Sequence, residues 1–584
     1  VMVKESKSAV TIRRRRFGDN RRSPASHHHK SAGDGEELQE EDEEWYEPVM
    51  RDGPRLLRLM LGSDKILFMT LLAFRGINAL MIQTAYVPDE YWQSVEVAHN
   101  MAYGYGYLTW EWRTGLRGFS YPALFAALYK LLGILHLDNR VLLIKLPRLI
   151  QGLFAALGDL YLYRLSRKLA GSGAAQWALL CQLTSWFTFF CGPRTLSNSM
   201  ETTLTTMALY YFPWPGKPRK AQWKYLSLVG LAIVMRPTAA IQWLPLCLWH
   251  AFMYRHAPWA ILKLFAERGF IILSLSSIVD RVFYAKWVNV HYNFLQFNVV
   301  SGQGTFYGSH PWHWYLSQGF PVIMGTQLFP FILAARKSSE RVCVMLIAWT
   351  ICCYSCLGHK EFRFLFPILP LAMHVCGVFL HSVCEDDQES EVGHQGEPQH
   401  NIPSIPRYSK PKPIYARAKV VILFLVLTNL PLAMYTSVIH QRGTVDVMKF
   451  LHDSPVYNRG VAKDIMFLMP CHSTPYYSYL HQNVSMRFLT CEPNLQGQPN
   501  YVDEADVFYQ NPTRWLHQVY TSAGNQLPTH LVMFNVLVPS VKEFLVQNGY
   551  QKCATLFHAH ITEGRVGSHV MVYCLKIPIV TKSS

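Results

Sequence analysis

The feature that most constrains this chain is a long central stretch that is apolar and almost free of acidic residues. Residues 61–384 contain only twelve Asp and Glu, whereas nine lie between Asp34 and Glu47 and six between Glu385 and Glu397. A water-soluble surface needs interspersed charges of both signs, and only 16% of the whole chain is charged, against roughly 25% in an ordinary soluble domain. Residues 61–384 are therefore expected to lie in a membrane.

The positive net charge does not by itself indicate a nucleic-acid partner. Lys and Arg outnumber Asp and Glu by 55 to 39, which gives a formal charge of +16. Such an excess is typical of nucleic-acid binders, but short cytoplasmic loops of membrane proteins also collect Lys and Arg. Because the basic residues here gather in loops between apolar runs, we predict a multi-pass membrane protein and no nucleic-acid partner.

Each membrane crossing needs about 20 mostly apolar residues in a helix, because a helix satisfies its own backbone hydrogen bonds in lipid. One arrangement places all the basic loops in the cytoplasm. In it, residues 119–137 lie along the membrane or re-enter it, and residues 225–254 cross twice, with a break at Arg236 and Pro237. A rival arrangement, in which 119–137 cross and 225–254 cross once, leaves two basic loops on the wrong face. Both arrangements give eleven spans. The clearest apolar runs are 66–87, 140–163, 174–192, 260–283, 316–334, 341–357, 361–384 and 418–438.

The chain is expected to divide into three parts. Residues 1–60 are polar and carry an acidic run, which predicts a disordered cytoplasmic tail. Residues 61–438 form the membrane domain, with a polar cytoplasmic linker at 385–412. Residues 439–584 then fall on the non-cytoplasmic side, where alternating apolar stretches and helical segments predict a small α/β domain.

Two features of the C-terminal part fit the non-cytoplasmic side. Asn483 begins an Asn-Val-Ser sequon, the acceptor pattern for N-glycosylation in the lumen. An even set of cysteines is compatible with disulfides in an oxidising compartment, with free thiols as the alternative. These cysteines are Cys471, Cys491, Cys553 and Cys574.

Carboxylates are costly at a membrane, so the few in the central stretch are candidates for function. Asp89 and Glu90 are adjacent, follow Pro88 and open an aromatic segment on the non-cytoplasmic face. Such neighbours often divide roles, one as a general base and the other as a structural or acceptor-holding group. The alternative is a helix N-terminus, where acidic side chains meet unsatisfied backbone amides. The two interpretations are compatible.

A second group of charged residues stands at the non-cytoplasmic mouth of the run 361–384. It consists of His359, Lys360, Glu361 and Arg363. If a helix has begun there, Lys360 and Arg363 share one face, and this cationic pair suits a phosphate group, with His359 as a further hydrogen-bonding partner. The alternative is a set of interfacial side chains that reach toward water, in which Glu361 would not be expected.

A third group lies in an aromatic loop that contains His310, Trp312 and His313. Aromatic rings stack on sugars, but they also form the interfacial belt of any membrane protein. No carboxylate lies near the histidines in sequence and their spacing matches no zinc template, so we expect no metal. Arg236 and Asp159 each lie inside an apolar run and are expected to pair with each other or to hold an anionic ligand, with structural pairing favoured for Asp159.

Together these motifs resemble those of the dolichol-phosphate-mannose-dependent mannosyltransferases of the endoplasmic reticulum, glycosyltransferase family 22. The motif His-Lys-Glu-x-Arg-Phe is the most specific one, and this chain has Phe362 where many members carry a second Glu. The resemblance covers the chain from about residue 66 to its end. It rests on Pro-Asp-Glu at 88–90, Gly-Tyr-Leu-Thr-Trp-Glu-Trp at 106–112, His-Pro-Trp-His-Trp-Tyr at 310–315 and His-Lys-Glu-x-Arg-Phe at 359–364.

The resemblance implies a GT-C glycosyltransferase fold, an all-α polytopic membrane protein that here has about 11 transmembrane helices and an active site facing the endoplasmic reticulum lumen. Such enzymes take mannose from dolichol-phosphate mannose with a single inversion and need no metal or other cofactor. Within the family, the chain looks most like members that add the third, α-1,2-linked mannose to the GPI-anchor precursor, so a lipid-linked sugar donor and a GPI glycolipid acceptor are the expected partners. The alternatives are a family-22 enzyme acting on the dolichol-linked N-glycan precursor and, fitting less well, a polytopic transporter.

The resemblance also implies roles for individual residues. Asp89 is expected to be the general base, and Glu90 to position the acceptor or to substitute partly for Asp89. The cations His359, Lys360 and Arg363 are expected to bind the donor phosphate and to stabilise the charge of the leaving group. The expected substrate-binding residues are Glu361, His310, Trp312, His313 and Arg236.

Overall fold

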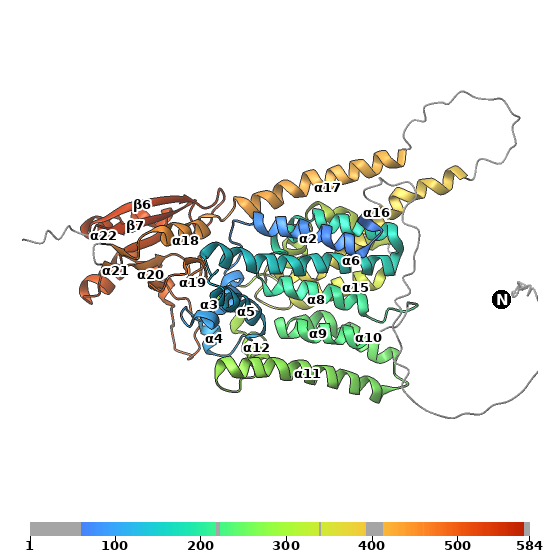
Figure 1. The fold of residues 1–584 in the computed structure, drawn as a ribbon, viewed down its shortest axis with the longest axis horizontal. Coiled ribbons are helices and arrows are strands. Elements are labelled where there is room, and N and C mark those ends of the chain that lie inside the picture. The colour runs from blue at the N-terminus through green and yellow to red at the C-terminus, as the bar shows by residue number, and fades with distance from the viewer. Residues whose placement is uncertain (1–59, 218–221, 338–339, 393–412, 459–460, 577–584) are drawn as a thin grey trace, which may run out of the picture. The chain divides into compact units, whose positions relative to one another are not determined.

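The structure, a computed structural model, describes residues 60–217, 222–337, 340–392, 413–458 and 461–576. A helical part runs to residue 438 and is followed by a domain built on a β-sheet (Figure 1). The expected tail at 1–60 lies outside the described residues, apart from its last residue. Of the expected linker at 385–412, residues 385–392 continue a helix, and the remainder also lies outside the described residues.

The helical part is a set of helices packed side by side around α6. Helix α6 contacts α2, α8 and α16, while α8 contacts α9, and α9 contacts α11 (Figure 1). The helices are α2 (Asp64–Met81), α3 (Glu96–Tyr103), α4 (Trp110–Arg113), α5 (Ser120–Ile134), α6 (Arg140–Thr184), α7 (Trp186–Cys191), α8 (Ser197–Tyr211), α9 (Gln222–Met235), α10 (Ala239–Met253), α11 (Pro258–Tyr284), α12 (Val290–Leu295), α13 (Phe320–Met324), α14 (Leu328–Lys337), α15 (Arg341–Ser355), α16 (Leu369–Val392) and α17 (Pro413–Val438).

Helix α6 is a hairpin of two arms. Its backbone leaves the helical region at Gly171, with φ of 87° and ψ of 174°, a conformation that favours glycine. The arms lie against each other, since Gln182 of the second arm donates a 3.1 Å hydrogen bond to Asp159 of the first. The two apolar runs expected at 140–163 and 174–192 therefore fold back on one another.

The described helices fit a multi-pass membrane protein. Four helical stretches are long and apolar enough to cross a membrane: Arg140–Thr184, Tyr315–Arg336, Phe362–Cys384 and Arg417–Asp453. Shorter apolar helices include α9 and α10, which are separate helices that meet at Arg236 and Pro237, as expected for a segment that crosses twice. The count of about eleven spans stays a prediction.

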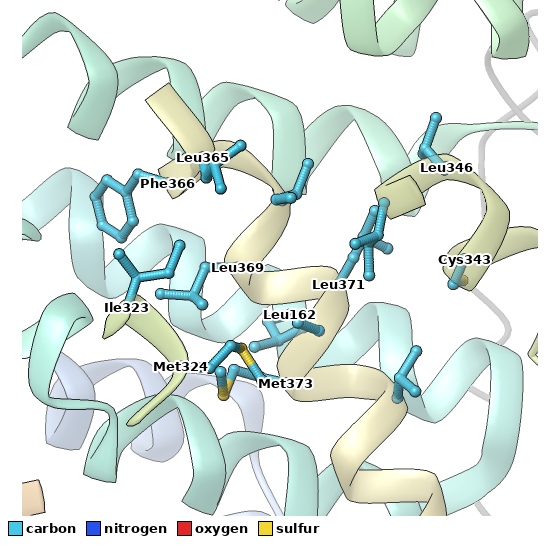
Figure 2. Close-up of a cluster of buried hydrophobic side chains, with 14 of the residues drawn as sticks. Leu162, Ile323, Met324, Cys343, Leu346, Leu365, Phe366, Leu369, Leu371 and Met373 are labelled. Atoms are coloured by element: carbon cyan, nitrogen blue, oxygen red, sulfur yellow. The ribbon is translucent and has the colours of Figure 1, made fainter. Parts of the chain in front are cut away.

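The helices differ in how much of their apolar surface lies inside the protein. In an apolar 18-residue window of the span Phe362–Cys384, 78% of residues are buried, against 28% in such a window of Arg417–Asp453. Helix α16 is therefore interior, whereas α17 leaves apolar side chains such as Leu423 and Leu427 exposed, as lipid contact requires. Figure 2 shows part of the cluster around α16: Ile323, Met324, Leu365, Phe366, Leu369 and Met373.

The C-terminal part contains the predicted α/β domain. Its main sheet has the strand order β4-β3-β5-β7-β6, with β3 parallel to β4 and β5, and β7 antiparallel to β5 and β6. The elements are α18 (Gly443–Asp453), β1 (Tyr457–Asn458), β2 (Val461–Ala462), β3 (Asp464–Leu468), α19 (Tyr477–Leu480), β4 (Ser485–Phe488), α20 (Glu504–Gln510), α21 (Pro512–Leu516), β5 (His530–Phe534), α22 (Val538–Gln547), β6 (Tyr550–Phe557) and β7 (His569–Leu575).

The sheet buries both faces, because alternate side chains of a strand point to opposite sides. From β3, Met466 and Leu468 pack in the cluster formed with α20, α21 and α22. Ile465 and Phe467 belong instead to a cluster that includes Trp92 and other side chains of the helical part. One continuous apolar core therefore joins the sheet domain to the helices near Asp89.

Two disulfides reinforce the sheet domain, Cys471–Cys491 and Cys553–Cys574, so the expected even set of cysteines is paired. Asn483 is exposed in the turn before β4, where an attached glycan would not disturb the core. Glycosylation of Asn483 stays a prediction.

Glu96, at the start of α3, holds the sheet domain at a specific place. Its carboxylate accepts hydrogen bonds from the backbone amides of Tyr476 (2.7 Å) and Ser478 (3.1 Å) and from the Ser478 hydroxyl. Glu96 is 1% exposed. Because buried donors need acceptors, this side chain fixes α19 to the helix that follows Asp89.

Glu96→Ala is expected to loosen the sheet domain from α3. Two amides and a hydroxyl would stay buried without their acceptor, which lowers the free energy of unfolding by about 3 kcal/mol. Thermal unfolding of the detergent-purified chain measures this, with Glu563→Ala, an exposed glutamate of the same domain, as the matched control. An unchanged midpoint for Glu96→Ala would contradict the docking role.

A pH dependence follows from the same side chain. Burial raises the pKa of Glu96 from 4.5 to about 7, although its three hydrogen bonds favour the charged form. The protonated side chain therefore contributes stability that is complete below the unfolded pKa of about 4.5 and is lost as the pH rises through 7. Relative to Glu96→Gln, which does not titrate, the unfolding midpoint of the wild type is expected to fall between about pH 5 and pH 8.

Candidate active site

Asp89 and Glu90 lie in the first turn of a helix, so the helix N-terminus interpretation is correct as far as it goes. The carbonyl of Pro88 accepts hydrogen bonds from the amides of Tyr91 and Trp92. A π-helical turn follows at Tyr91–Val95, a type of irregularity that occurs often at functional sites. The two carboxylates contact different partners, Arg363 for Asp89 and Arg148 with Arg194 for Glu90, and the expected division of roles stays a prediction.

Glu90 is fully buried between two arginines. One carboxylate oxygen accepts from Arg148 of α6 at 2.9 Å, and the other accepts from Arg194 at 2.6 Å. The Glu90 side chain is 0% exposed. The side chain therefore offers no surface to a substrate in this structure and anchors its helix, and the expected role of Glu90 toward the acceptor stays a prediction.

Asp89 contacts the second group of charged residues, at 359–363, through Arg363. Arg363 Nη1 lies 2.6 Å from Asp89 Oδ2, and the same guanidinium donates to both oxygens of Glu361 at 2.6 Å. The Asp89 side chain is 23% exposed, whereas that of Arg363 is 6% exposed. The two charged motifs, about 270 residues apart in sequence, therefore form one cluster in which Asp89 keeps an accessible edge.

Lys360 has a different place from the one expected. The helical turn here begins at Phe362, so Lys360 and Arg363 do not share a helix face. The ammonium of Lys360 donates to the backbone carbonyls of His310 (3.0 Å) and Leu357, and the residue is 3% exposed. In this position Lys360 ties two loops together.

The aromatic loop at 308–315 is joined to the segment that carries His359. His359 contacts the carbonyl of Gly308 through Nδ1 and Glu361 through Nε2, both at 3.1 Å. The amide of His310 donates to the carbonyl of Gly358, and its ring stacks on Trp314. This arrangement brings His310 to the mouth of the site.

The other expected residues of this loop stay at the surface. Trp312 is 69% exposed, and the exposed His313 contacts Ser317. Their expected contact with a substrate stays a prediction.

Arg236 and Asp159 do not pair with each other. Asp159 is held by Arg75 through contacts of 2.6 and 3.0 Å, which confirms a structural pairing but with another partner. Arg236 lies 3.3 Å from Glu201 and donates to Asn198, whose amide donates to the carbonyl of Arg363. Arg236 is thus connected to the charged cluster through Asn198.

Sequence reasoning missed Arg117, which donates to Glu111 at 2.6 and 3.1 Å. Although burial opposes it, Glu111 and Asp89 raise the pKa of Arg117, which places this second arginine near the Asp89 carboxylate. Glu111 belongs to the motif at 106–112, so that motif contained a usable signal. Nothing around Arg117 in sequence distinguishes it from a basic loop residue.

The sheet domain also reaches the site. The ring of His472 lies 4.8 Å from that of Trp92, and burial lowers the pKa of His472 to about 4 despite the nearby Asp89. Tyr307 accepts a hydrogen bond from Trp110 and donates one to the carbonyl of Cys491. The disulfide Cys471–Cys491 therefore joins the segment next to His472 to the segment that Tyr307 contacts.

The charges in the cluster support one another. Burial alone would raise the pKa of Glu361, but Arg363 and His359 hold it well below its usual range. The hydrogen bond to Glu361 raises the pKa of His359 against the effect of its burial. The site thus offers an accessible carboxylate beside an arginine and a histidine that favours its cationic form, a combination that suits proton removal next to a phosphate leaving group.

The sequence is similar to those of known mannosyltransferases. The sequence matches the profile of the Alg9-like mannosyltransferase family over residues 66–481. It is 46% identical over 526 residues to the GPI alpha-1,2-mannosyltransferase 3 of Mus musculus, covering 89% of this chain and 91% of that protein. It is 39% identical over 511 residues to the GPI mannosyltransferase 3 of Drosophila melanogaster, covering 85% and 84%.

The fold is also similar to that of a solved structure. The crystal structure of ArnT from Cupriavidus metallidurans bound to undecaprenyl phosphate matches with a TM-score of 0.53 at 12% identity, covering 87% of this chain and 97% of that one. This likeness supports the expected GT-C fold.

The different settings of the two adjacent carboxylates give a direct test. Glu90→Ala leaves two buried guanidinium groups without a counter-charge and is expected to lower the free energy of unfolding by about 3–5 kcal/mol. Asp89→Ala removes a part-exposed carboxylate whose partner retains Glu361, so it is expected to unfold close to the wild type. Thermal unfolding in detergent compares them, and equal midpoints would contradict the structural role of Glu90.

Proposed function

Because the chain belongs to the Alg9-like mannosyltransferase family, we propose that it transfers the third, α-1,2-linked mannose to the GPI-anchor precursor. The proposal is supported by likeness, over most of the chain, to proteins named for α-1,2-mannosyl transfer in GPI synthesis. The donor is dolichol-phosphate mannose and the acceptor is the GPI glycolipid that carries two mannoses. Both substrates are membrane lipids, which suits a site at the end of a helical membrane domain.

The ion pair between Asp89 and Arg363 is the observation that carries the mechanism. In a single displacement, a hydroxyl of the acceptor attacks the anomeric carbon of the donor, the bond to the phosphate breaks, and the configuration inverts. Asp89 takes the proton of that hydroxyl as general base. Glu90 is a positioning residue, because its ion pairs with Arg148 and Arg194 fix the turn that carries Asp89.

The leaving group is dolichyl phosphate, whose negative charge grows as the bond breaks. A guanidinium has five N–H groups, and Arg363 uses three of them on Asp89 and Glu361. The other two are proposed to donate to the phosphate, and His359, whose ring nitrogens already contact Gly308 and Glu361, is proposed to contribute only its positive charge. Lys360 is instead proposed to position His359 and His310 by joining their loops, since its ammonium is already directed at two carbonyls.

We further propose that Arg236, Glu361 and the aromatic loop with His310, Trp312 and His313 bind the substrates around this centre. No metal takes part in the proposed transfer.

The endoplasmic reticulum membrane is the proposed location, with the site and the sheet domain in the lumen. Two disulfides in the sheet domain support an oxidising compartment on that side. Basic residues gather at the opposite end of the helices, where Lys168 donates to the carbonyls of Tyr210 and Phe212 at the end of α8. Such a bias is typical of the cytoplasmic face.

The assignment is tested by an in vitro assay with dolichol-phosphate mannose and a two-mannose GPI precursor. The wild-type chain in detergent is expected to form a three-mannose product with an α-1,2 linkage, identified by mass spectrometry and linkage-specific mannosidase digestion. Asp89→Asn is expected to reduce turnover about 100-fold or more, because it removes the base. The matched control is Glu543→Gln, an exposed glutamate of α22 in the sheet domain.

Other outcomes would reject parts of the proposal separately. Mannosylation of an oligosaccharide-diphosphodolichol instead of the GPI precursor would assign the chain to N-glycan precursor synthesis. Near-normal turnover of a folded Asp89→Asn variant would show that another group removes the proton. Absence of any mannosyl transfer by the folded wild type would reject the enzyme.

Arg363→Lys tests the bridging role of the guanidinium. A lysine keeps the charge but cannot meet Asp89 and both oxygens of Glu361 at once, so turnover is expected to fall about 30-fold or more while the chain stays folded. Arg565→Lys is the matched control, because Arg565 forms an exposed ion pair with Asp506. Unchanged kcat and KM for the lipid donor in Arg363→Lys would mean that the bridge is not required.

A further inference from the structure

A second group of reactive side chains lies at the end of the helices opposite Asp89. Glu340 immediately precedes α15, Cys343 lies in its first turn, and His374 comes from α16. One ligand atom from each lies within 4.8 Å of the other two. Cys343 is a free cysteine, 1% exposed, that Figure 2 shows beside Leu346. A carboxylate, a thiol and an imidazole thus meet at one point.

The imidazole of His374 is aimed at this point with an unused nitrogen. Its Nδ1 lies 3.0 Å from the hydroxyl of Ser166 in α6. Its Nε2 is buried and has no hydrogen-bond partner among the described residues, and the whole side chain is 0% exposed. An Nδ1–H that donates to Ser166 leaves the Nε2 lone pair free, which is how proteins orient a histidine that binds a metal.

The spacing of the ligand atoms fits a coordinated ion better than a direct hydrogen bond. His374 Nε2 lies 3.5 Å from Glu340 Oε2, beyond the usual range of about 2.7–3.2 Å for an N–H···O bond. Zinc bonds to nitrogen and to carboxylate oxygen are about 2.0–2.2 Å long. At a tetrahedral angle, two such ligand atoms lie roughly 3.4 Å apart. The gap therefore has the size of one edge of a zinc coordination tetrahedron.

The charges also balance for a divalent ion. Metal binding releases the thiol proton of Cys343 to solvent, and a thiolate, a carboxylate and a neutral imidazole then neutralise two positive charges. A neutral cluster is the form that a buried site tolerates best. The Glu340 side chain is 19% exposed, so the ion can enter from this end and complete its shell with water.

We propose that Glu340, Cys343 and His374 bind one zinc ion, with Ser166 orienting His374. The site is distinct from the proposed transfer site and does not depend on that function. By joining the start of α15 to α16, and through Ser166 to α6, the ion holds these helices together at the end opposite Asp89. The other group with ligand spacing among the described residues, Cys471, His472 and Cys491, is excluded because both of its cysteines are disulfide-bonded.

The zinc content of the full chain tests the proposal. The protein is purified in detergent with an affinity tag that lacks histidine, and bound zinc is measured by atomic emission. About one zinc ion per chain is expected for the wild type and for Cys376→Ser, a control at another buried free cysteine of α16. Cys343→Ser is expected to bind zinc at least about 10-fold more weakly. The histidines at 27–29 are present in every variant, so any zinc held there cancels in the comparison.

Two further measurements keep the proposal testable if Cys343→Ser does not fold. Replacement of zinc by cobalt is expected to give the thiolate-to-cobalt absorption of a tetrahedral site in the wild type. Removal of zinc by a chelator is expected to lower the unfolding midpoint of the wild type and of Cys376→Ser alike. Equal zinc in the wild type and Cys343→Ser, no thiolate–cobalt band, or a midpoint that does not respond to the chelator would overturn the proposal.

Discussion

The buried carboxylate of Glu90 is the interaction on which the site depends. A charge removed from water is tolerated only when it is paired, and Glu90 meets Arg148 and Arg194 on its two oxygens. These contacts fix the turn after Pro88 to α6 and to the segment before α8. The neighbouring side chain, Asp89, then points away from this pair and meets Arg363. One residue of an adjacent pair therefore anchors the turn, and the other remains accessible for chemistry.

The helix that begins at Asp89 is held from two sides. Glu90 fixes it to the membrane helices, while Glu96 caps the start of α19 and fixes the sheet domain. Trp92, between them, donates to the carbonyl of Thr474 and packs in the apolar cluster shared with the sheet. The sheet domain is thus part of the wall around the site.

The polar side chains inside the helical part follow the same rule of pairing. Arg75 holds Asp159 between α2 and α6, and Arg236 lies against Glu201 beside α8. In an apolar environment each such pair specifies which helices meet, because an unpaired partner would be costly. At the end opposite Asp89, the proposed zinc ion would serve the same purpose for α15 and α16, with two anionic ligands neutralised by one cation.

The sequence by itself determined the class of the protein, because scarcity of acidic residues over more than 300 positions leaves no alternative to a membrane. It also predicted a small α/β domain in the C-terminal part and singled out the two charged motifs that form the site, since Asp89 and Glu361 stand out where acids are rare. The even set of cysteines there was compatible with disulfides, and the structure decided that they pair. The tertiary structure decided how these residues are used. The sequence could not show that Glu90 is buried, that Lys360 binds carbonyls, that Arg117 approaches Asp89, or that Asp159 pairs with Arg75 rather than Arg236. The partner of a charge depends on which helices pack together, and helix packing is set by side chains far apart in the chain.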